Sequence, residues 1–202
     1  RLPAEVVRDQ ALHAAGLLSD TLGGPPAMPP QPAGLWRTPY SDLVWETTPA
    51  NRHRRGLYTF WRRTNPYPAM TTFDAGSGEV CTIRRIRTNT PLQALVTLND
   101  PAFLEAAAVL GERMDDGGGV DGGIGIGVRR VLGRPPVPAE TARLAALWRD
   151  ALAEYRKHPD LARTLLATAN RTPGKDTDVG RLAAWAVIGN VLLNLDEALV
   201  RP

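Results

Sequence analysis

The chain has 202 residues, of which 43% are hydrophobic and 22% charged, enough to build one ordinary hydrophobic core. Its net charge is only +3, and it has neither a lysine-rich tail nor an RNA-binding aromatic motif, so we expect no nucleic-acid partner. The single cysteine excludes an internal disulfide and a cysteine-based zinc site, and we expect no metal site. No apolar stretch of about 18 residues is free of charges, which predicts no membrane span in this chain.

The N-terminal part predicts one helix followed by irregular backbone. Residues 3–19 have a helical pattern, because Pro3 suits a first turn and apolar residues recur on one face. Residues 20–55 are rich in proline, which keeps the backbone extended and irregular. We expect the aromatic side chains of this segment to dock on the core as an irregular cover: Trp36, Tyr40 and Trp45.

Residues 51–87 are unusually basic. They contain eight arginines and two acidic residues, Asp74 and Glu79, which leaves a local charge of +6. Residues 57–61 form a short β-prone run, so at most one or two short strands are expected. A loop of this length inside a compact domain is usually functional or well anchored.

The clearest helix start lies just after this basic segment. Thr90 suits the N-cap, Pro91 suits the first helical position, and Gln93 is placed to close a capping box. Pro101 then interrupts the pattern, and Asp100 is expected to cap a second helix. The buried face of the first of these helices is predicted from its apolar residues: Leu92, Leu95 and Val96.

The last part of the chain combines a glycine-rich run with further helices. Residues 117–127 contain seven glycines and predict a flexible loop, since little opposes backbone entropy there. Residues 117–122 formally match the dinucleotide-binding pattern, but no strand precedes them, so we expect no nucleotide site. Helices are predicted over residues 138–158 and 160–169. The almost wholly apolar residues 178–200 predict a third, central helix.

Together these elements predict a mainly α fold. We expect one helical, bundle-like domain over residues 1–202, wrapped by the long irregular segment rich in arginine and aromatic residues. The chain starts with Arg1 inside a helical pattern rather than with methionine. We therefore expect it to be the C-terminal portion of a longer protein.

Several motifs occur in a specific order: residues 1–9, residues 54–68, Thr72-Phe73-Asp74-Ala75, Arg84-Arg85-Ile-Arg-Thr-Asn-Thr-Pro-Leu-Gln-Ala-Leu95 and the closing residues 192–197. Together they resemble the planctomycete surface-protein family called domain of unknown function 1553, over nearly the whole chain. The resemblance implies an exported protein, periplasmic or at the cell surface. It also implies upstream domains of the same polypeptide as partners, with haem c bound upstream and no cofactor in this chain.

The candidate site is the arginine cluster before the capped helix, formed by Arg84, Arg85 and Arg87. The helix N-terminus adds partial positive charge, so one hypothesis is a pocket for sulfate, phosphate or a uronate carboxylate. The other hypothesis is structural, with buried arginines tying the loop to carbonyl groups and to Asp74, Glu79, Asn99 or Asp100. Further residues would fit the anion pocket: Asp74, Thr88, Asn89, Gln93 and Trp61.

Catalytic alternatives use residues of the same region. Cys81 would need His53 as its base, and Asp74 with Glu79 could form the carboxylate pair of a glycosidase. Trp61, with Tyr58 and Tyr67, would either stack on sugars or pack against the helices.

Two functions therefore remain open. The first is a non-catalytic binding or assembly domain for an anionic or sulfated extracellular ligand. The second is an extracellular enzyme, redox-linked or polysaccharide-active, with Asp74, Glu79, Cys81 and the arginines in a cleft. An open pocket in which Asp74 and Arg84 converge would favour a site, whereas burial with mutual pairing would favour a scaffold.

Overall fold

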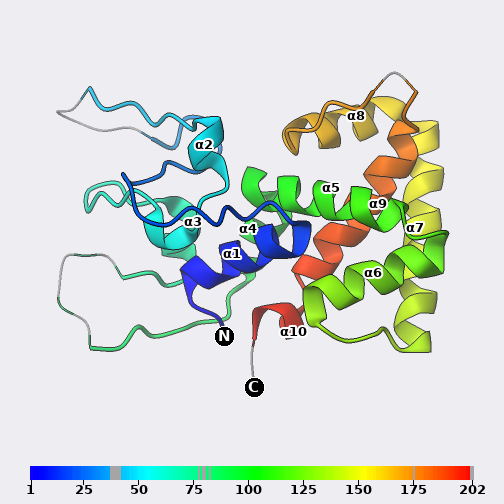
Figure 1. Ribbon diagram of the computed structural model, residues 1–202, viewed down its shortest axis with the longest axis horizontal. Helices are drawn as coiled ribbons and strands as arrows, with labels where there is room; N and C mark the ends of the chain where they lie inside the picture. Colours follow the sequence, from blue (N-terminus) through cyan, green and yellow to red (C-terminus); the bar gives the residue numbers. More distant parts are fainter. Residues whose placement is uncertain (37–41, 77, 79–80, 82, 175, 201–202) are drawn as a thin grey trace.

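The computed structural model in Figure 1 describes residues 1–36, 42–76, 78, 81, 83–174 and 176–200. These residues form helices and no strand, apart from an isolated parallel bridge between Ala27 and Thr59, so the predicted mainly α fold is confirmed. No single described helix is long and apolar enough to cross a membrane; α4 and α5 pass that test only as a pair bent by 58°. The helices are α1 (Ala4–Ala15), α2 (Pro49–Arg52), the 3-10 helix η1 (Gly56–Tyr58), α3 (Pro68–Thr72), α4 (Pro91–Asn99), α5 (Pro101–Asp115), α6 (Val120–Leu132), α7 (Pro138–Lys157), α8 (Pro159–Thr168), α9 (Val179–Leu193) and α10 (Asp196–Leu199).

Helices α5 and α9 form the centre of the fold, and α1, α6, α7 and α8 pack around them (Figure 1). The apolar helix α9 buries Trp185, Ile188 and Leu192, so its predicted central position is confirmed. It ends at Leu193, however, and the short α10 follows as a separate helix. The close approach of α5 to α9 requires Gly111, because a Cβ atom there would lie 2.8 Å from the carbonyl carbon of Trp185.

Most of the glycine-rich run is helical, so the predicted flexible loop over residues 117–127 is wrong. Only residues 117–119 lie outside a helix, and α6 includes the rest. Gly123 is buried, and a side chain there would collide with a backbone carbonyl of α5 and the tryptophan ring of α9. The glycines therefore permit close helix packing. The core positions of α6 follow the helical period: Ile124, Val128 and Val131.

Helix α4 begins as predicted but turns the opposite face inward. Thr90 and Gln93 form the expected capping box, so the predicted N-terminus is confirmed. The predicted buried face is wrong, because Leu92 and Leu95 are exposed and Val96 is only half-buried. The fully buried side chains of this helix are polar: Gln93 and Thr97.

The N-terminal half is largely irregular around α1, α2 and α3. Helix α1 ends at Ala15, earlier than predicted, where Gly16 adopts a left-handed conformation with φ of 73°. The ring of Trp45 stacks on that of Tyr67 with centroids 5.7 Å apart, and the Tyr67 hydroxyl donates to the Pro30 carbonyl over 2.8 Å. The predicted docking of aromatic side chains is thus confirmed for Trp45, whereas Tyr40 lies outside the described residues.

Candidate anion-binding site

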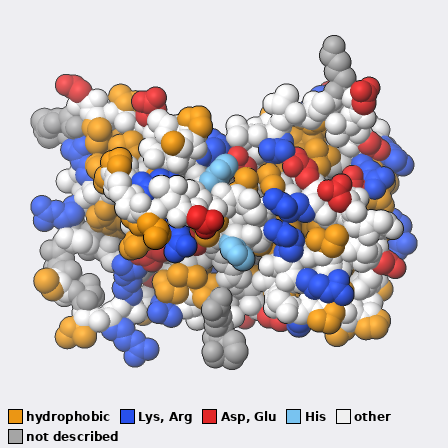
Figure 2. Space-filling model, viewed as in Figure 1, with side chains coloured by type: hydrophobic (Ala, Val, Ile, Leu, Met, Phe, Trp, Pro, Cys, Tyr) orange, Lys and Arg blue, Asp and Glu red, His pale blue; other side chains and the backbone are white. Residues whose placement is uncertain are grey.

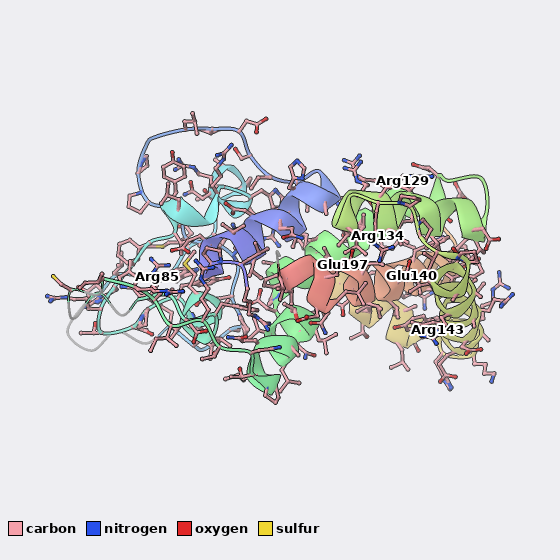
Figure 3. All side chains as sticks on the ribbon, turned by 90° about the horizontal axis from the view of Figure 1, so that it is seen from below. Arg85, Arg129, Arg134, Glu140, Arg143 and Glu197 are labelled. Carbon is pink, nitrogen blue, oxygen red and sulfur yellow. The ribbon has the colours of Figure 1, made fainter. Side chains whose placement is uncertain are left out.

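A cavity of about 870 Å³ opens where the start of α1, the end of α3 and the segment before α4 meet. Figure 2 shows basic and hydrophobic side chains side by side over the lower left of the molecule, where this segment runs in Figure 1. Figure 3 places Arg85 at this end, far from Arg143 on α7. The cavity is lined by Arg1, Pro3, Ala4, Phe73, Asp74, Ile83, Arg84, Arg85, Ile86 and Arg87.

Asp74 is held by neighbours other than the arginines. It follows α3 in a left-handed conformation, with φ of 61°, which aspartate tolerates better than most residues. Its Oδ2 atom accepts hydrogen bonds from the Thr88 backbone N–H at 2.6 Å, from Thr88 Oγ1 at 2.8 Å and from Gln93 Nε2 at 3.2 Å. Burial acts to raise the pKa of Asp74, but the hydrogen bonds from Thr88 and Gln93 outweigh it and hold the pKa below its ordinary value.

The three arginines are exposed, so the structural hypothesis of buried arginines paired with Asp74 is wrong. Arg85 Nη1 contacts Glu5 Oε1 at 2.7 Å, and Arg87 Nη1 donates to the Arg1 carbonyl at 2.7 Å. Arg84 has no hydrogen-bond or ion-pair partner among the described residues. The segment therefore lies against α1 and the residues just before it through two of its arginines, while the third is available to a ligand.

Gln93 connects the cavity to the helices below it. Its amide donates to the Thr72 carbonyl at 2.9 Å as well as to Asp74, and its side-chain oxygen accepts from the Thr90 backbone N–H. The Gln93 side chain is fully buried and its bonds are partly buried, so water competes with them less than at the surface. Gln93 thus fixes the end of α3, the start of α4 and the orientation of Asp74.

The remaining candidate residues lie around the cavity rather than inside it. Thr88 reaches Asp74, whereas Asn89 is exposed. Trp61 is half-buried, packs against the main core and lines a neighbouring cavity of about 440 Å³. That second cavity shares Arg85 with the first, so the two hollows adjoin at this guanidinium.

The described residues do not bring the side chains of either catalytic alternative together. Cys81 is exposed, and Glu79 lies outside the described residues. His53 faces Glu105 on α5, with Nε2 3.3 Å from Oε1. No group of three histidine, cysteine or acidic residues in the described part of the chain is arranged to hold a metal ion.

A buried polar cluster was not predicted from the sequence. Glu105 is 3% exposed and binds Arg52 Nε at 2.8 Å and Asn170 Nδ2 at 3.1 Å. Burial acts to raise the pKa of Glu105, but the contacts with His53, Asn170 and Arg52 keep it below its ordinary value. Arg8, also buried, donates to the carbonyls of residues 52 and 54. The available signal was the position of Arg8, four residues from both Ala4 and Leu12 on the buried face of α1.

The fold and the cavity define a mainly helical domain with an open, arginine-lined pocket. The sequence matches a family described as a protein of unknown function (DUF1553) over residues 1–148, and the chain belongs to that family. The match includes every residue that lines the pocket. No curated protein and no solved structure matches the chain.

Proposed function

We propose that this domain is a binding and assembly module that receives an anionic group in the arginine-lined cavity. The observation that carries the proposal is the composition of the cavity wall, where, among the described residues, four arginines accompany one carboxylate, that of Asp74. The oxygens of Asp74 are already occupied by Thr88 and Gln93, so this carboxylate forms no ion pair with the described arginines. The cavity therefore retains a surplus of positive charge.

The chemistry of the wall suits carboxylate, sulfate or phosphate groups. A guanidinium presents a planar set of donors that binds such anions through two parallel hydrogen bonds. Arg84 is without a described partner, and Phe73, Ile83 and Ile86 add apolar surface beside it. A ligand with an acidic group on a carbon framework, such as a uronate or a sulfated sugar, matches both parts of the wall.

The family resemblance supplies the setting of this proposal. Exported planctomycete proteins with an upstream cytochrome c domain would meet sulfated or uronate polymers outside the cytoplasm, and upstream domains of the same polypeptide would carry haem c. Asp74 does not suit the role of general acid in a glycosidase, because that role needs a raised pKa whereas the pKa of Asp74 is lowered. The proposed role of Asp74 is to position the loop through Thr88.

A thermal-shift experiment with sulfate tests the proposal. Sodium sulfate is compared with sodium chloride at equal ionic strength for the wild type, Arg84→Ala and Arg143→Ala. A specific site stabilises the folded state by about 2.7 kcal/mol when sulfate exceeds its dissociation constant a hundredfold. Arg143 is an exposed arginine at the other end of the molecule (Figure 3), so its removal tests for non-specific charge effects.

We expect sulfate to stabilise the wild type and Arg143→Ala but not Arg84→Ala. Equal stabilisation of all three proteins would mean that sulfate acts without this site. An absence of sulfate-specific stabilisation in the wild type, repeated with galacturonate oligomers, would contradict the proposal.

A further inference from the structure

Helix α4 exposes its apolar side and buries its polar side. Gln93 and Thr97 are completely buried, whereas Leu92, Leu95 and Leu98 are 57%, 55% and 37% exposed. The three leucines recur every third residue, so they lie along one side of the helix. We call them the leucine face of α4. A surface helix normally has the opposite arrangement, with its apolar stripe against the core.

Specific hydrogen bonds hold this orientation in place. Thr97 Oγ1 donates to Asn194 Oδ1, just after α9, at 2.5 Å, and Asn190 Nδ2 donates to the Thr97 carbonyl at 3.3 Å. Gln93 is bound to the Thr72 carbonyl at the end of α3. Turning the leucines inward would break these partly buried bonds, so the isolated domain keeps its leucine face in water.

The segment that leads into α4 continues the same composition. Ile83 and Ile86 are 108% and 82% exposed and alternate with Arg84, Arg85 and Arg87. Between residues 81 and 99 the sequence contains no aspartate or glutamate. The leucine face is therefore preceded, within a few residues, by a purely basic segment with apolar side chains of its own.

We infer that the leucine face of α4 is a docking site for a protein segment that presents an apolar stripe flanked by carboxylates, such as an acidic amphipathic helix. Aliphatic anchors spaced along one helix side are a common mode of helix recognition, and burial of such side chains drives association. The arginines that precede α4 in the sequence favour an acidic partner and disfavour a basic one. Charge also argues against a second copy of this chain, because a symmetric contact would bring two sets of arginines together.

A peptide-display selection tests the partner chemistry. Random 16-residue peptides are selected on the full chain, and the enriched peptides are measured against the wild type and three variants. Leu95→Ser alters the leucine face, while Leu161→Ser on α8 is the matched control, because both leucines are 55% exposed. Leu92→Ser serves as a second test variant. The sulfate experiment is run on the same proteins to separate this surface from the anion cavity.

We expect enriched peptides with aliphatic residues at helical spacing and an excess of aspartate and glutamate. They should bind Leu95→Ser and Leu92→Ser at least tenfold more weakly than the wild type, bind Leu161→Ser unchanged, and weaken several-fold from 50 to 300 mM sodium chloride. Melting temperature and sulfate response should be retained in all variants. Failure of sulfate binding with intact peptide binding would overturn only the proposed function.

Several results would overturn the inference. These are the absence of enriched peptides, enrichment of neutral or basic peptides, equal binding to Leu95→Ser, or marked destabilisation of both face variants. Self-association of the wild type in sedimentation equilibrium that is lost in Leu95→Ser would identify a second copy as the occupant instead. Flotation with phosphatidylcholine–phosphatidylglycerol vesicles that is lost in the same variant would identify a membrane surface.

Discussion

Asp100 offers a sharp test of the energetics of this fold. It is only 7% exposed, and its Oδ1 atom caps α5 by accepting a hydrogen bond from the Ala102 backbone N–H at 2.9 Å. Burial raises the pKa of Asp100 to about 6, and this effect outweighs the opposing influence of the Ala102 hydrogen bond and the charge of Arg8. The ionised carboxylate of Asp100 therefore lowers the stability of the folded protein at neutral pH.

The substitution Asp100→Asn should remove that cost and keep the cap, since asparagine is as good an N-cap as aspartate. The pKa of Asp100 is about 4 in the unfolded chain and about 6 in the folded protein. The wild type therefore loses stability as the pH rises from about 4 to about 6. This difference of about two pKa units corresponds to a loss of about 3 kcal/mol in the free energy of unfolding. The variant should match the wild type near pH 4 and be more stable by up to this amount at pH 7.

Urea denaturation of both proteins at pH 4, 5, 6 and 7 measures this difference. Asp150→Asn, at an exposed position on α7, is the control and should change stability by no more than about 0.5 kcal/mol. A less stable Asp100→Asn variant at pH 7 would refute the reasoning, because the attraction of Arg8 for the carboxylate would then exceed the cost of burial. A difference that does not change with pH would refute it as well.

Two further predictions concern packing and caps. Thr90→Ala should lower the free energy of unfolding, measured by urea denaturation, by about 0.5–2 kcal/mol. Gln93→Ala should lower it by about 1–3 kcal/mol more, because it also leaves the Thr72 carbonyl unpaired. Equal losses for the two variants would contradict the proposed role of Gln93 in joining α3 to α4. Gly123→Ala should lower the melting temperature, since its methyl group would meet a backbone carbonyl, whereas Gly125→Ala, which meets only the end of an arginine side chain at 3.4 Å, should be neutral or stabilising by up to about 1 kcal/mol. Equal melting temperatures for the two glycine variants would show that α6 tolerates separation from α5.

The features predicted correctly from the sequence are those decided by neighbouring residues. The capping box of Thr90 and Gln93 and the cap of α5 by Asp100 each involve positions two or three residues apart. Such signals are complete within one turn of a helix. The central position of α9 was also predictable, because a helix that is apolar on all sides has no face suited to water.

The failures arise where contacts distant in the sequence decide the outcome. The glycines of α6 indicate flexibility when read locally, yet the neighbouring helix α9 supplies the packing that they permit. The leucines of α4 indicate a buried face, yet Thr97 bonds Asn194, which lies 97 residues away. The partner in that bond lies outside α4, so the orientation of the helix could not be predicted from the pattern of its own residues.

The candidate site combines features decided by neighbouring residues with features decided by contacts distant in the sequence. The sequence places Asp74 and the arginines in one loop, and the fold brings them to one cavity. Their expected pairing fails because Gln93 and Thr88 bind Asp74 instead. Gln93 also anchors the start of α4, so the same buried amide occupies Asp74 and holds the helix with its leucines outward. An anionic ligand and an acidic, apolar protein segment are the partners that we propose for these two surfaces.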